Sequence, residues 1–101
     1  MKKIYISGKI TGLPIEGASE NFNRAEIYLK SKGYEVMNPM KEVPFNKSWS
    51  WGDYMRSAII LMMKCDSIYM LNTHEESKGA LIELQLAKDL QMTRSYQENA
   101  L

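Results

Sequence analysis

Residues 67–91 read SIYMLNTHEESKGALIELQLAKDLQ, which joins a β-prone run, a polar loop and an amphipathic stretch. The run Ser67–Leu71 favours a strand because it is apolar and contains an isoleucine and a tyrosine. The amphipathic stretch favours a helix that begins near Ser77, a residue type that caps helices, and ends at about Gln91. A strand that leads into a helix across a short loop is the unit from which parallel α/β sheets are built.

Two further strand–helix pairs precede this unit and complete the predicted fold. Strands are expected at 3–7, 34–37 and near 94–96, helices at 19–33 and from Ser50 to about Cys65, and loops at 8–17 and 40–50. This alternation predicts an α/β fold: a small three-layer, Rossmann-like or flavodoxin-like parallel sheet of three or four strands, with helices on both faces. The chain has no internal repeat or low-complexity segment, so residues 1–101 are expected to form one domain.

Composition and charge argue against several classes of partner. The 13 lysines and arginines are interleaved with 12 acidic residues, so we expect no nucleic-acid partner, which would need clustered cations. The longest apolar run, Ala58–Met63, is far shorter than the ~20 residues of a membrane span, and no membrane partner is expected. A single cysteine, Cys65, fits a cytoplasmic protein without internal disulfides. With one histidine besides, neither a metal site nor a cofactor is expected.

A glutamate interrupts the apolar face of the predicted helix that follows Ser77. At 100° per residue, Glu83 falls at the centre of an apolar arc formed by Ala80, Ile82, Leu84, Leu86, Ala87 and Leu90. Burying an unpaired carboxylate costs several kcal/mol, so the position requires an explanation. One interpretation is a buried ion pair or a subunit contact. The other is a carboxylate with a perturbed pKa that faces a pocket, since ligands of such sheets bind at the carboxyl ends of the strands.

The helix predicted after Ser50 has a more ordinary pattern. Its expected buried stripe comprises Met55, Ala58, Ile59, Met62 and Cys65, and its opposite side carries Asp53, Arg56, Ser57 and Lys64. The methionines are interpreted as core side chains, and Cys65 as a small buried hydrophobic residue rather than a reactive thiol.

The loop after the first predicted strand reads SGKITG, residues 7–12. Its glycines allow backbone N–H groups to approach an anion, and phosphate is a natural ligand for them, although ordinary tight turns have the same composition. Ser77 can contact a phosphate as well as cap its helix. His74 is expected to be solvated rather than catalytic. Trp49 and Trp51 either cover the sheet edge or form a lid over the pocket.

Several segments together resemble a known family. They are residues 4–8 (IYISG), 21–25 (NFNRA), 33–39 (GYEVMNP), 65–71 (CDSIYML) and 77–84 (SKGALIEL). Their types and order resemble the small DUF4406 proteins, which are common in phages and bacteria and are grouped with the nucleoside 2-deoxyribosyltransferases. The resemblance covers about residues 3–92.

The resemblance implies roles for individual residues. Deoxyribosyltransferases and the related deoxynucleoside 5′-monophosphate N-glycosidase use a glutamate in a Gly-x-x-x-Glu-Leu segment. Here Gly79 begins that segment, and Glu83 would attack C1′ of the deoxyribose to form a glycosyl ester. Tyr5 matches a tyrosine that orients this glutamate, and Ser77 resembles a serine that contacts phosphate. With Ser7, Gly8, Lys9, Thr11 and Gly12, this favours a small-molecule nucleotide as the partner over a free nucleoside.

The sequence departs from the family pattern at one important position. Both enzyme groups carry an aspartate eight residues before the aspartate that opens the third strand, and it handles the proton on the leaving base. Counting back from Asp66 gives Ala58. Asp53 cannot take its place, because it lies about 140° around a regular helix from Ala58.

Three functions therefore remain open from the sequence. The first is an enzyme that cleaves or transfers at an N-glycosidic bond. The second is a catalytically impaired protein on the same fold that senses or sequesters a nucleotide. The third is an assembly protein in which Glu83 forms a subunit salt bridge. A homodimer or higher homo-oligomer is expected in each case, because so small a sheet leaves edges and helix faces uncovered.

Overall fold

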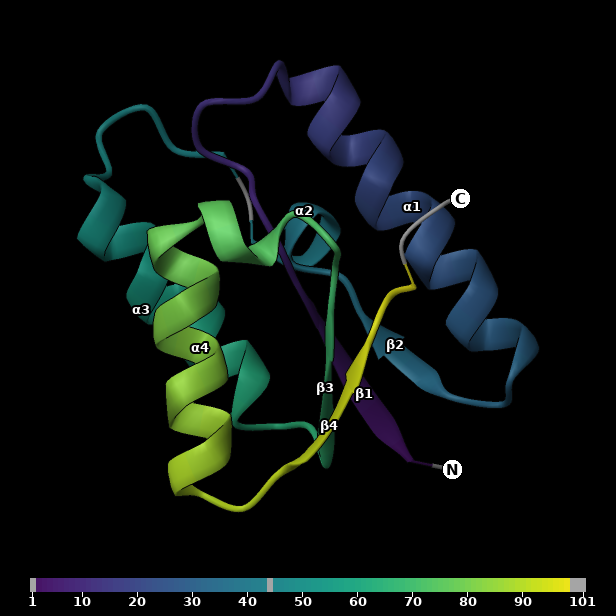
Figure 1. The fold of residues 1–101 in the computed structure, drawn as a ribbon. Coiled ribbons are helices and arrows are strands. Elements are labelled where there is room, and N and C mark those ends of the chain that lie inside the picture. The colour runs from purple at the N-terminus through teal and green to yellow at the C-terminus, as the bar shows by residue number, and fades with distance from the viewer. Residues whose placement is uncertain (1, 44, 99–101) are drawn as a thin grey trace.

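Four parallel strands form the sheet in the computed structural model, which describes residues 2–43 and 45–98. They are β1 (Lys3–Ser7), β2 (Glu35–Met37), β3 (Ser67–Met70) and β4 (Thr93–Tyr96), and they lie in the order β2-β1-β3-β4 (Figure 1). The chain moves outward to β2 on one side of β1 and to β3 and β4 on the other. The strand order thus reverses between β1 and β3, and ligands of open α/β sheets bind beyond the carboxyl ends of such strands.

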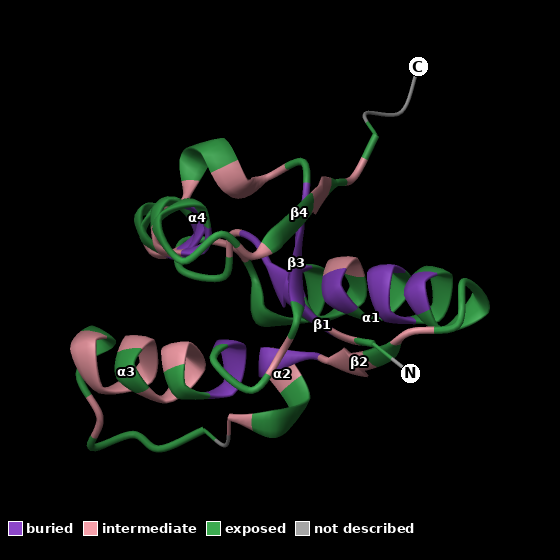
Figure 2. Cartoon of the chain, turned by 90° about the horizontal axis from the view of Figure 1, so that it is seen from below, coloured by how far each residue is buried: buried purple, intermediate pink, exposed green. Residues whose placement is uncertain are grey.

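Helices cover both faces of the sheet, as predicted. Helix α1 (Ile15–Ser31) packs on one face, and α3 (Trp51–Met62) and α4 (Lys78–Asp89) lie on the other (Figure 2). A one-turn helix, α2 (Pro39–Glu42), follows β2, and a short 3-10 helix, η1 (His74–Glu76), precedes α4. None of the helices among the described residues has the length and apolar character needed to cross a membrane.

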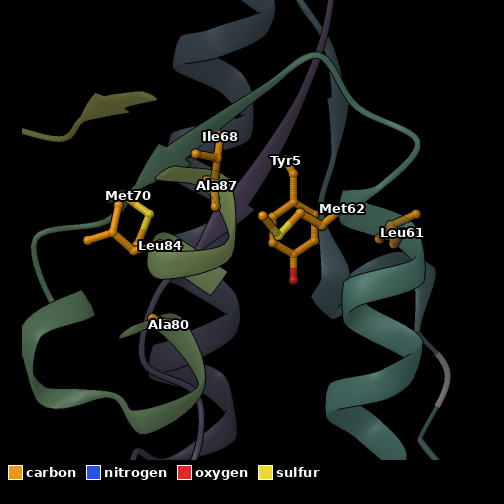
Figure 3. Close-up of a cluster of buried hydrophobic side chains, with 8 residues drawn as sticks. All are labelled: Tyr5, Leu61, Met62, Ile68, Met70, Ala80, Leu84 and Ala87. Atoms are coloured by element: carbon orange, nitrogen blue, oxygen red, sulfur yellow. The ribbon is translucent and has the colours of Figure 1, made fainter. Parts of the chain in front are cut away.

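The core is divided by the alternation of side chains along the strands. Ile4 and Ile6 of β1 pack with Phe22 of α1 on one face. Tyr5 lies on the other face, in a cluster with Met62 of α3 and Leu84 of α4 (Figure 3). In that cluster the hydroxyl of Tyr5 points into the space between α3 and α4.

Helix α1 begins four residues earlier than the sequence predicted, at Ile15 rather than at Ser19. Pro14 supplies the backbone angle that starts the helix, and its carbonyl accepts the Ala18 N–H at 3.0 Å. Gly17, interpreted as part of a turn, lies inside the helix. A glycine inside a helix costs about 1 kcal/mol. The first turns are nevertheless anchored to the sheet by Ala18 and Phe22, which are both fully buried. The helix ends at Ser31, two residues before the predicted 33, and the predicted stop signal Gly33 follows it with a φ of +92°.

The loop predicted at 40–50 was wrong in its first residues, because α2 occupies residues 39–42. Asn38 caps this turn through its side chain, which accepts the Met40 N–H at 3.0 Å, and Pro39 fits the first helical position. The pair Asn38-Pro39 was interpreted as the end of a strand, although the same two residues also start helices.

The last two helices end slightly earlier than predicted. Helix α3 has the predicted Ser50 cap, closed by Asp53 into a capping box, but it ends at Met62 because Lys64 and Cys65 form a turn into β3. Helix α4 ends at Asp89 rather than Gln91, because Gln91 adopts a left-handed backbone with φ 58°.

Only part of each predicted apolar stripe is buried. In α4 the buried residues are Ala80, Glu83, Leu84 and Ala87, whereas Ile82 and Leu90 are 40% and 52% exposed. In α3 Leu61 and Met62 are buried, whereas Met55, Ala58 and Ile59 are only half-buried. A four-stranded sheet is narrow, so each helix contacts it along a strip narrower than its apolar arc. The homo-oligomer expected from the sequence stays a prediction.

Candidate active site

Glu83 is the central residue of the candidate site. Its side chain is almost fully enclosed, with 4% of the residue exposed. The Tyr5 hydroxyl donates to Oε2 at 2.7 Å, and the Ser7 hydroxyl donates to Oε1 at 2.7 Å. The ion pairs found among residues 2–43 and 45–98 all lie elsewhere, so none of these residues supplies Glu83 with a cation. This geometry argues against the ion-pair interpretation within one subunit.

The local sequence explains why these three side chains meet. Tyr5 and Ser7 are two residues apart on β1, so both point to the face that α4 covers. Helix α4 starts at the carboxyl edge of the sheet, where Ser77 caps it by accepting the Ala80 N–H at 3.1 Å. Glu83 follows one turn after Ala80, on the same face of the helix. The carboxylate therefore lies directly above the end of β1.

Burial and hydrogen bonding act in opposite directions on the pKa of Glu83. Burial raises the pKa of this carboxyl group above its ordinary value, and the hydrogen bonds from Ser7 and Tyr5 only partly oppose that rise. The pKa of Tyr5 is raised well above its ordinary value by burial and by the charge of Glu83. Tyr5 thus keeps its proton and acts as a donor. The result is a carboxyl group that two hydroxyls orient and that has no cation partner among the described residues, which suits a nucleophile.

A cavity of about 700 Å³ opens onto Glu83. This volume lies within the range of about 300–1,000 Å³ that is usual for small-molecule sites. Its floor is the end of β1, and its walls are the loop after β1, the segment around α2, and the first turns of α3 and α4. Most of its lining is apolar, and the aromatic side chains of Phe22, Phe45, Trp51 and Tyr54 contribute to it in addition to Tyr5.

The structure brings most of the sequence-predicted site residues to this cavity. Those that line it are Tyr5, Ser7, Gly8, Thr11, Ser77, Gly79 and Glu83. Two lie outside its lining. Lys9 extends toward η1, where its ammonium pairs with Glu76 at 3.6 Å and its backbone N–H donates to Thr73. Gly12 forms the turn before α1 with a φ of +89°.

Two residues of the predicted phosphate loop have structural partners that the sequence did not suggest. The Ser7 hydroxyl donates to Glu83 instead of facing the solvent. At Gly8 a β-carbon would lie 2.6 Å from Cδ1 of Leu71, so only glycine allows the loop to pass this close to the end of β3. Close packing therefore accounts for Gly8 without a ligand.

The position expected to handle the proton of the leaving group carries no acid. Ala58 lines the cavity on the α3 side. Asp53 is outside the lining and is engaged at the start of α3, where its carboxylate accepts the Ser50 N–H at 2.8 Å and pairs with Arg56. As expected from the helical geometry, Asp53 does not replace the missing acid.

Of the other residues singled out from the sequence, one lines the cavity and the others lie elsewhere in the fold. Trp51 lines the cavity, whereas Trp49 packs edge-on against Tyr54 outside its lining. His74 is half-buried, with Nδ1 2.7 Å from the Leu71 carbonyl. Cys65 is half-buried as well, and burial raises the pKa of its thiol to about 11, which fits an unreactive side chain. Among the residues that the structure describes, no three metal-binding side chains gather into a site.

Sequence reasoning missed much of the apolar wall. Ile10, Phe22, Phe45, Tyr54 and Met55 line the cavity although none was proposed as a site residue. A signal was available for Met55, because Trp51, Met55 and Ala58 are spaced at i, i+4 and i+7 and so share one face of α3. Phe45 had no such signal, because it lies in a segment without regular structure.

A family model and a solved structure are similar to this chain. The model of a family described as a domain of unknown function, DUF4406, matches residues 2–96. A solved structure of a 2-deoxyribosyltransferase from Bacillus psychrosaccharolyticus superposes with a TM-score of 0.71 over 98% of this chain and 76% of that one. The two are 15% identical, so this likeness demonstrates a common fold. No curated protein matches the sequence.

Proposed function

We propose that this chain, which belongs to the DUF4406 family, cleaves or transfers at the N-glycosidic bond of a 2′-deoxynucleoside or its 5′-monophosphate. The observation that carries the proposal is Glu83, a buried carboxylate with two hydroxyl donors that opens onto a cavity at the switch point of the sheet. The protein of like fold bears the name of a 2-deoxyribosyltransferase, which agrees with this chemistry.

In the proposed reaction Glu83 is the nucleophile. One carboxylate oxygen attacks C1′ through an oxocarbenium-like transition state, the C1′–N bond breaks, and the base leaves with the electron pair. Water, or the nitrogen of a second base, then attacks C1′ and releases the carboxylate, which gives hydrolysis or transfer. Tyr5 and Ser7 are positioning residues in this scheme, because they hold the carboxylate by its two oxygens.

The proposed phosphate subsite lies at the rim of the cavity. Ser77 and Thr11 line the cavity from the start of α4 and from the loop after β1, and the N-terminus of α4 favours an anion there. Gly8 and Gly79 line the cavity beside them, Gly8 buried and Gly79 half-buried. Lys9 and Gly12 lie in the same loop, outside the lining, and Lys9 would have to turn away from Glu76 to reach a phosphate.

A second function is favoured by one specific observation, the absence of an acid at Ala58. General acid assistance typically contributes about 10²–10⁴-fold to rate. Without an acid at this position, the protein would bind a nucleotide in the same cavity and cleave it slowly or not at all.

The test is incubation with a set of 2′-deoxynucleosides and their 5′-monophosphates, with free base followed by chromatography. The enzyme predicts base release that Glu83→Gln abolishes and that Glu26→Gln, at a buried glutamate outside the cavity, retains. The nucleotide-binding protein predicts an increase in melting temperature with nucleotide but no release. No response to any nucleotide would contradict both proposals.

A further inference from the structure

The cavity places a limit on which base can leave. When a neutral purine or pyrimidine departs, its nitrogen gains the electron pair of the broken bond and becomes an anion unless a proton arrives. A positioned acid that supplies this proton is typically worth about 10²–10⁴-fold. The groups able to supply it can be examined one by one, since only a few titratable side chains line the cavity.

Each of these titratable groups is already engaged. The Tyr5 hydroxyl donates to Glu83, and the Tyr54 hydroxyl donates to the Asn46 carbonyl at 2.8 Å. The Glu76 carboxylate pairs with Lys9 and lies mostly in solvent. Besides these, the described lining contains only Glu83 itself and Lys78, whose ammonium lies over the Trp51 ring, 4.8 Å from its centre.

Among the described lining residues, the wall contributed by α3 presents no carboxylic acid to the cavity, and its Tyr54 hydroxyl already donates to the Asn46 carbonyl. Trp51, Met55 and Ala58 form this wall, and its outer part reaches the first turn of α4. A β-carbon added at Gly79 would lie 2.8 Å from the Met55 sulfur and 3.7 Å from the Trp51 ring. An indole, a thioether and a methyl group therefore replace any acid on the side of the cavity that faces α4.

The same wall suits a flat, positively charged ring. Aromatic faces attract cations, with tryptophan the strongest, and quaternary nitrogen compounds are recognised by such aromatic surroundings. Phe45 is 79% exposed and Trp51 is 41% exposed, and both line the cavity. The Trp51 ring already attracts one cation, the Lys78 ammonium, so a cationic base would stack on Phe45 or take the place of Lys78. The buried Glu83 carboxylate has no cation among the described residues, and a cationic base beside it would supply the missing opposite charge.

From these observations we propose that the preferred substrates are N-glycosides whose base already carries a positive charge, such as N7-alkylated purine deoxynucleotides. This rests on the proposed function, with Glu83 as nucleophile. The C1′–N9 bond breaks as a Glu83 oxygen bonds to C1′, and the electron pair neutralises the purinium, so the base leaves without accepting a proton. Water then cleaves the ester and passes its proton to the solvent.

The experiment compares base release from N7-methyl-2′-deoxyguanosine 5′-monophosphate and from 2′-deoxyguanosine 5′-monophosphate. Spontaneous loss is measured without protein and with Glu83→Gln, and is subtracted. We expect kcat/KM for the methylated nucleotide to be higher by at least about 100-fold, the lower range of what general acid assistance supplies. Values within about tenfold of each other would overturn the inference and leave the proposed function standing. No release of either base above the Glu83→Gln level would contradict the proposed function instead.

Ala58→Asp sharpens the comparison, with Ala58→Asn as the matched variant that adds similar bulk without an acid. The aspartate is expected to raise release from the unmethylated nucleotide by at least about tenfold and to leave the methylated one unchanged, whereas the asparagine raises neither. Equal effects of the aspartate on both nucleotides would contradict the inference. The ratio measured for the unaltered protein decides the matter if Ala58→Asp does not fold.

Discussion

Glu26 and Glu83 are buried to almost the same extent, 6% and 4% exposed, yet their surroundings differ in kind. They lie on α1 and α4, which pack on opposite faces of the sheet (Figure 2). Glu26 accepts a hydrogen bond from Asn38 at 3.0 Å and pairs with Lys30 at 2.8 Å and Lys41 at 3.2 Å. Glu83 has two neutral hydroxyl donors and no cation among the described residues.

The pKa values of the two carboxyl groups move in opposite directions. Burial acts to raise the pKa of Glu26, but the hydrogen bonds from Lys30, Asn38 and Lys41 outweigh it, and the pKa is lowered. At Glu83 burial prevails and the pKa is raised. A neutralised glutamate ties α1 to the segment after β2 and is part of the fold. A glutamate whose charge is left uncompensated beside a cavity is maintained at a cost to stability, which is typical of functional sites.

The largest expected effect is on catalysis. Glu83→Gln should lower kcat/KM for base release by at least about 10³-fold, because an amide oxygen cannot form the glycosyl ester or stabilise the oxocarbenium-like transition state. Glu26→Gln, a change of the same chemistry at a similarly buried position, should remain within about threefold of the unaltered protein. Steady-state kinetics on the two variants measure the difference, and equal losses in both would mean that Glu83 is only structural.

The second prediction concerns stability on the α1 face. Glu26→Gln should lower the free energy of unfolding by about 2 kcal/mol at neutral pH, because the charge-assisted bonds to Lys30 and Lys41 are lost. The folded pKa of Glu26 is lowered, so its contribution is present above the ordinary value of 4.5 and is lost as the pH falls through the folded pKa. Denaturant unfolding of both proteins from acid to neutral pH tests this. A loss of stability that does not shrink in acid would show that the charge is not its source.

The third prediction separates orientation from burial at Glu83. Tyr5→Phe removes a hydrogen bond that lowers the pKa of Glu83, so the acid limb of kcat/KM should move to higher pH and kcat should fall about tenfold. Ser7→Ala should move the limb in the same direction, because its hydroxyl holds the other oxygen. A loss of rate with an unchanged pH profile would mean that these hydroxyls merely pack against Glu83.

The two glutamates also show how far the sequence leads. Glu83 stands out because it interrupts an apolar arc, but Glu26 interrupts one too: Phe22, Ala25 and Leu29 surround it at helical spacing, and all three are buried. The pattern therefore identifies buried carboxylates without distinguishing a paired one from an unpaired one. That distinction depends on Asn38, which was interpreted as the end of a strand, and on Lys41, which α2 brings to Glu26 from a segment predicted as loop. Contacts between distant segments leave no periodic signal.

The sequence of β1 contained a signal for the contact between Ser7 and Glu83 that was not used. Tyr5 was assigned through the family resemblance, and Ser7 was assigned to a phosphate loop because of the glycine that follows it. The two-residue period of a strand places the side chains of Tyr5 and Ser7 on one face. Because Tyr5 was expected to contact Glu83, the same contact could have been predicted for Ser7. The strands β1 and β3 were predictable because each is a short apolar run next to turn residues, whereas β4, which reads TRSY, gave only a weak signal. The aromatic wall of the cavity was not predictable, because Phe22 belongs to α1 and Phe45 to an irregular segment.

The smallest expected effect is that of Glu83→Gln on stability, and it contrasts most directly with the effect of Glu26→Gln. Because the folded pKa of Glu83 is raised, its contribution to stability is fully present below the ordinary value of 4.5 and is lost as the pH rises through the folded pKa. At neutral pH the protein therefore carries the cost of a buried charge, which Glu83→Gln removes, and the amide can still pair with the hydroxyls of Tyr5 and Ser7. We expect this variant to be more stable than the unaltered protein at pH 8 and to match it below pH 4.5. The sign is opposite to that for Glu26→Gln at the same pH. A Glu83→Gln variant that is less stable at pH 8 would show that the carboxylate is compensated in the folded protein, and the distinction between a structural and a functional glutamate would no longer hold.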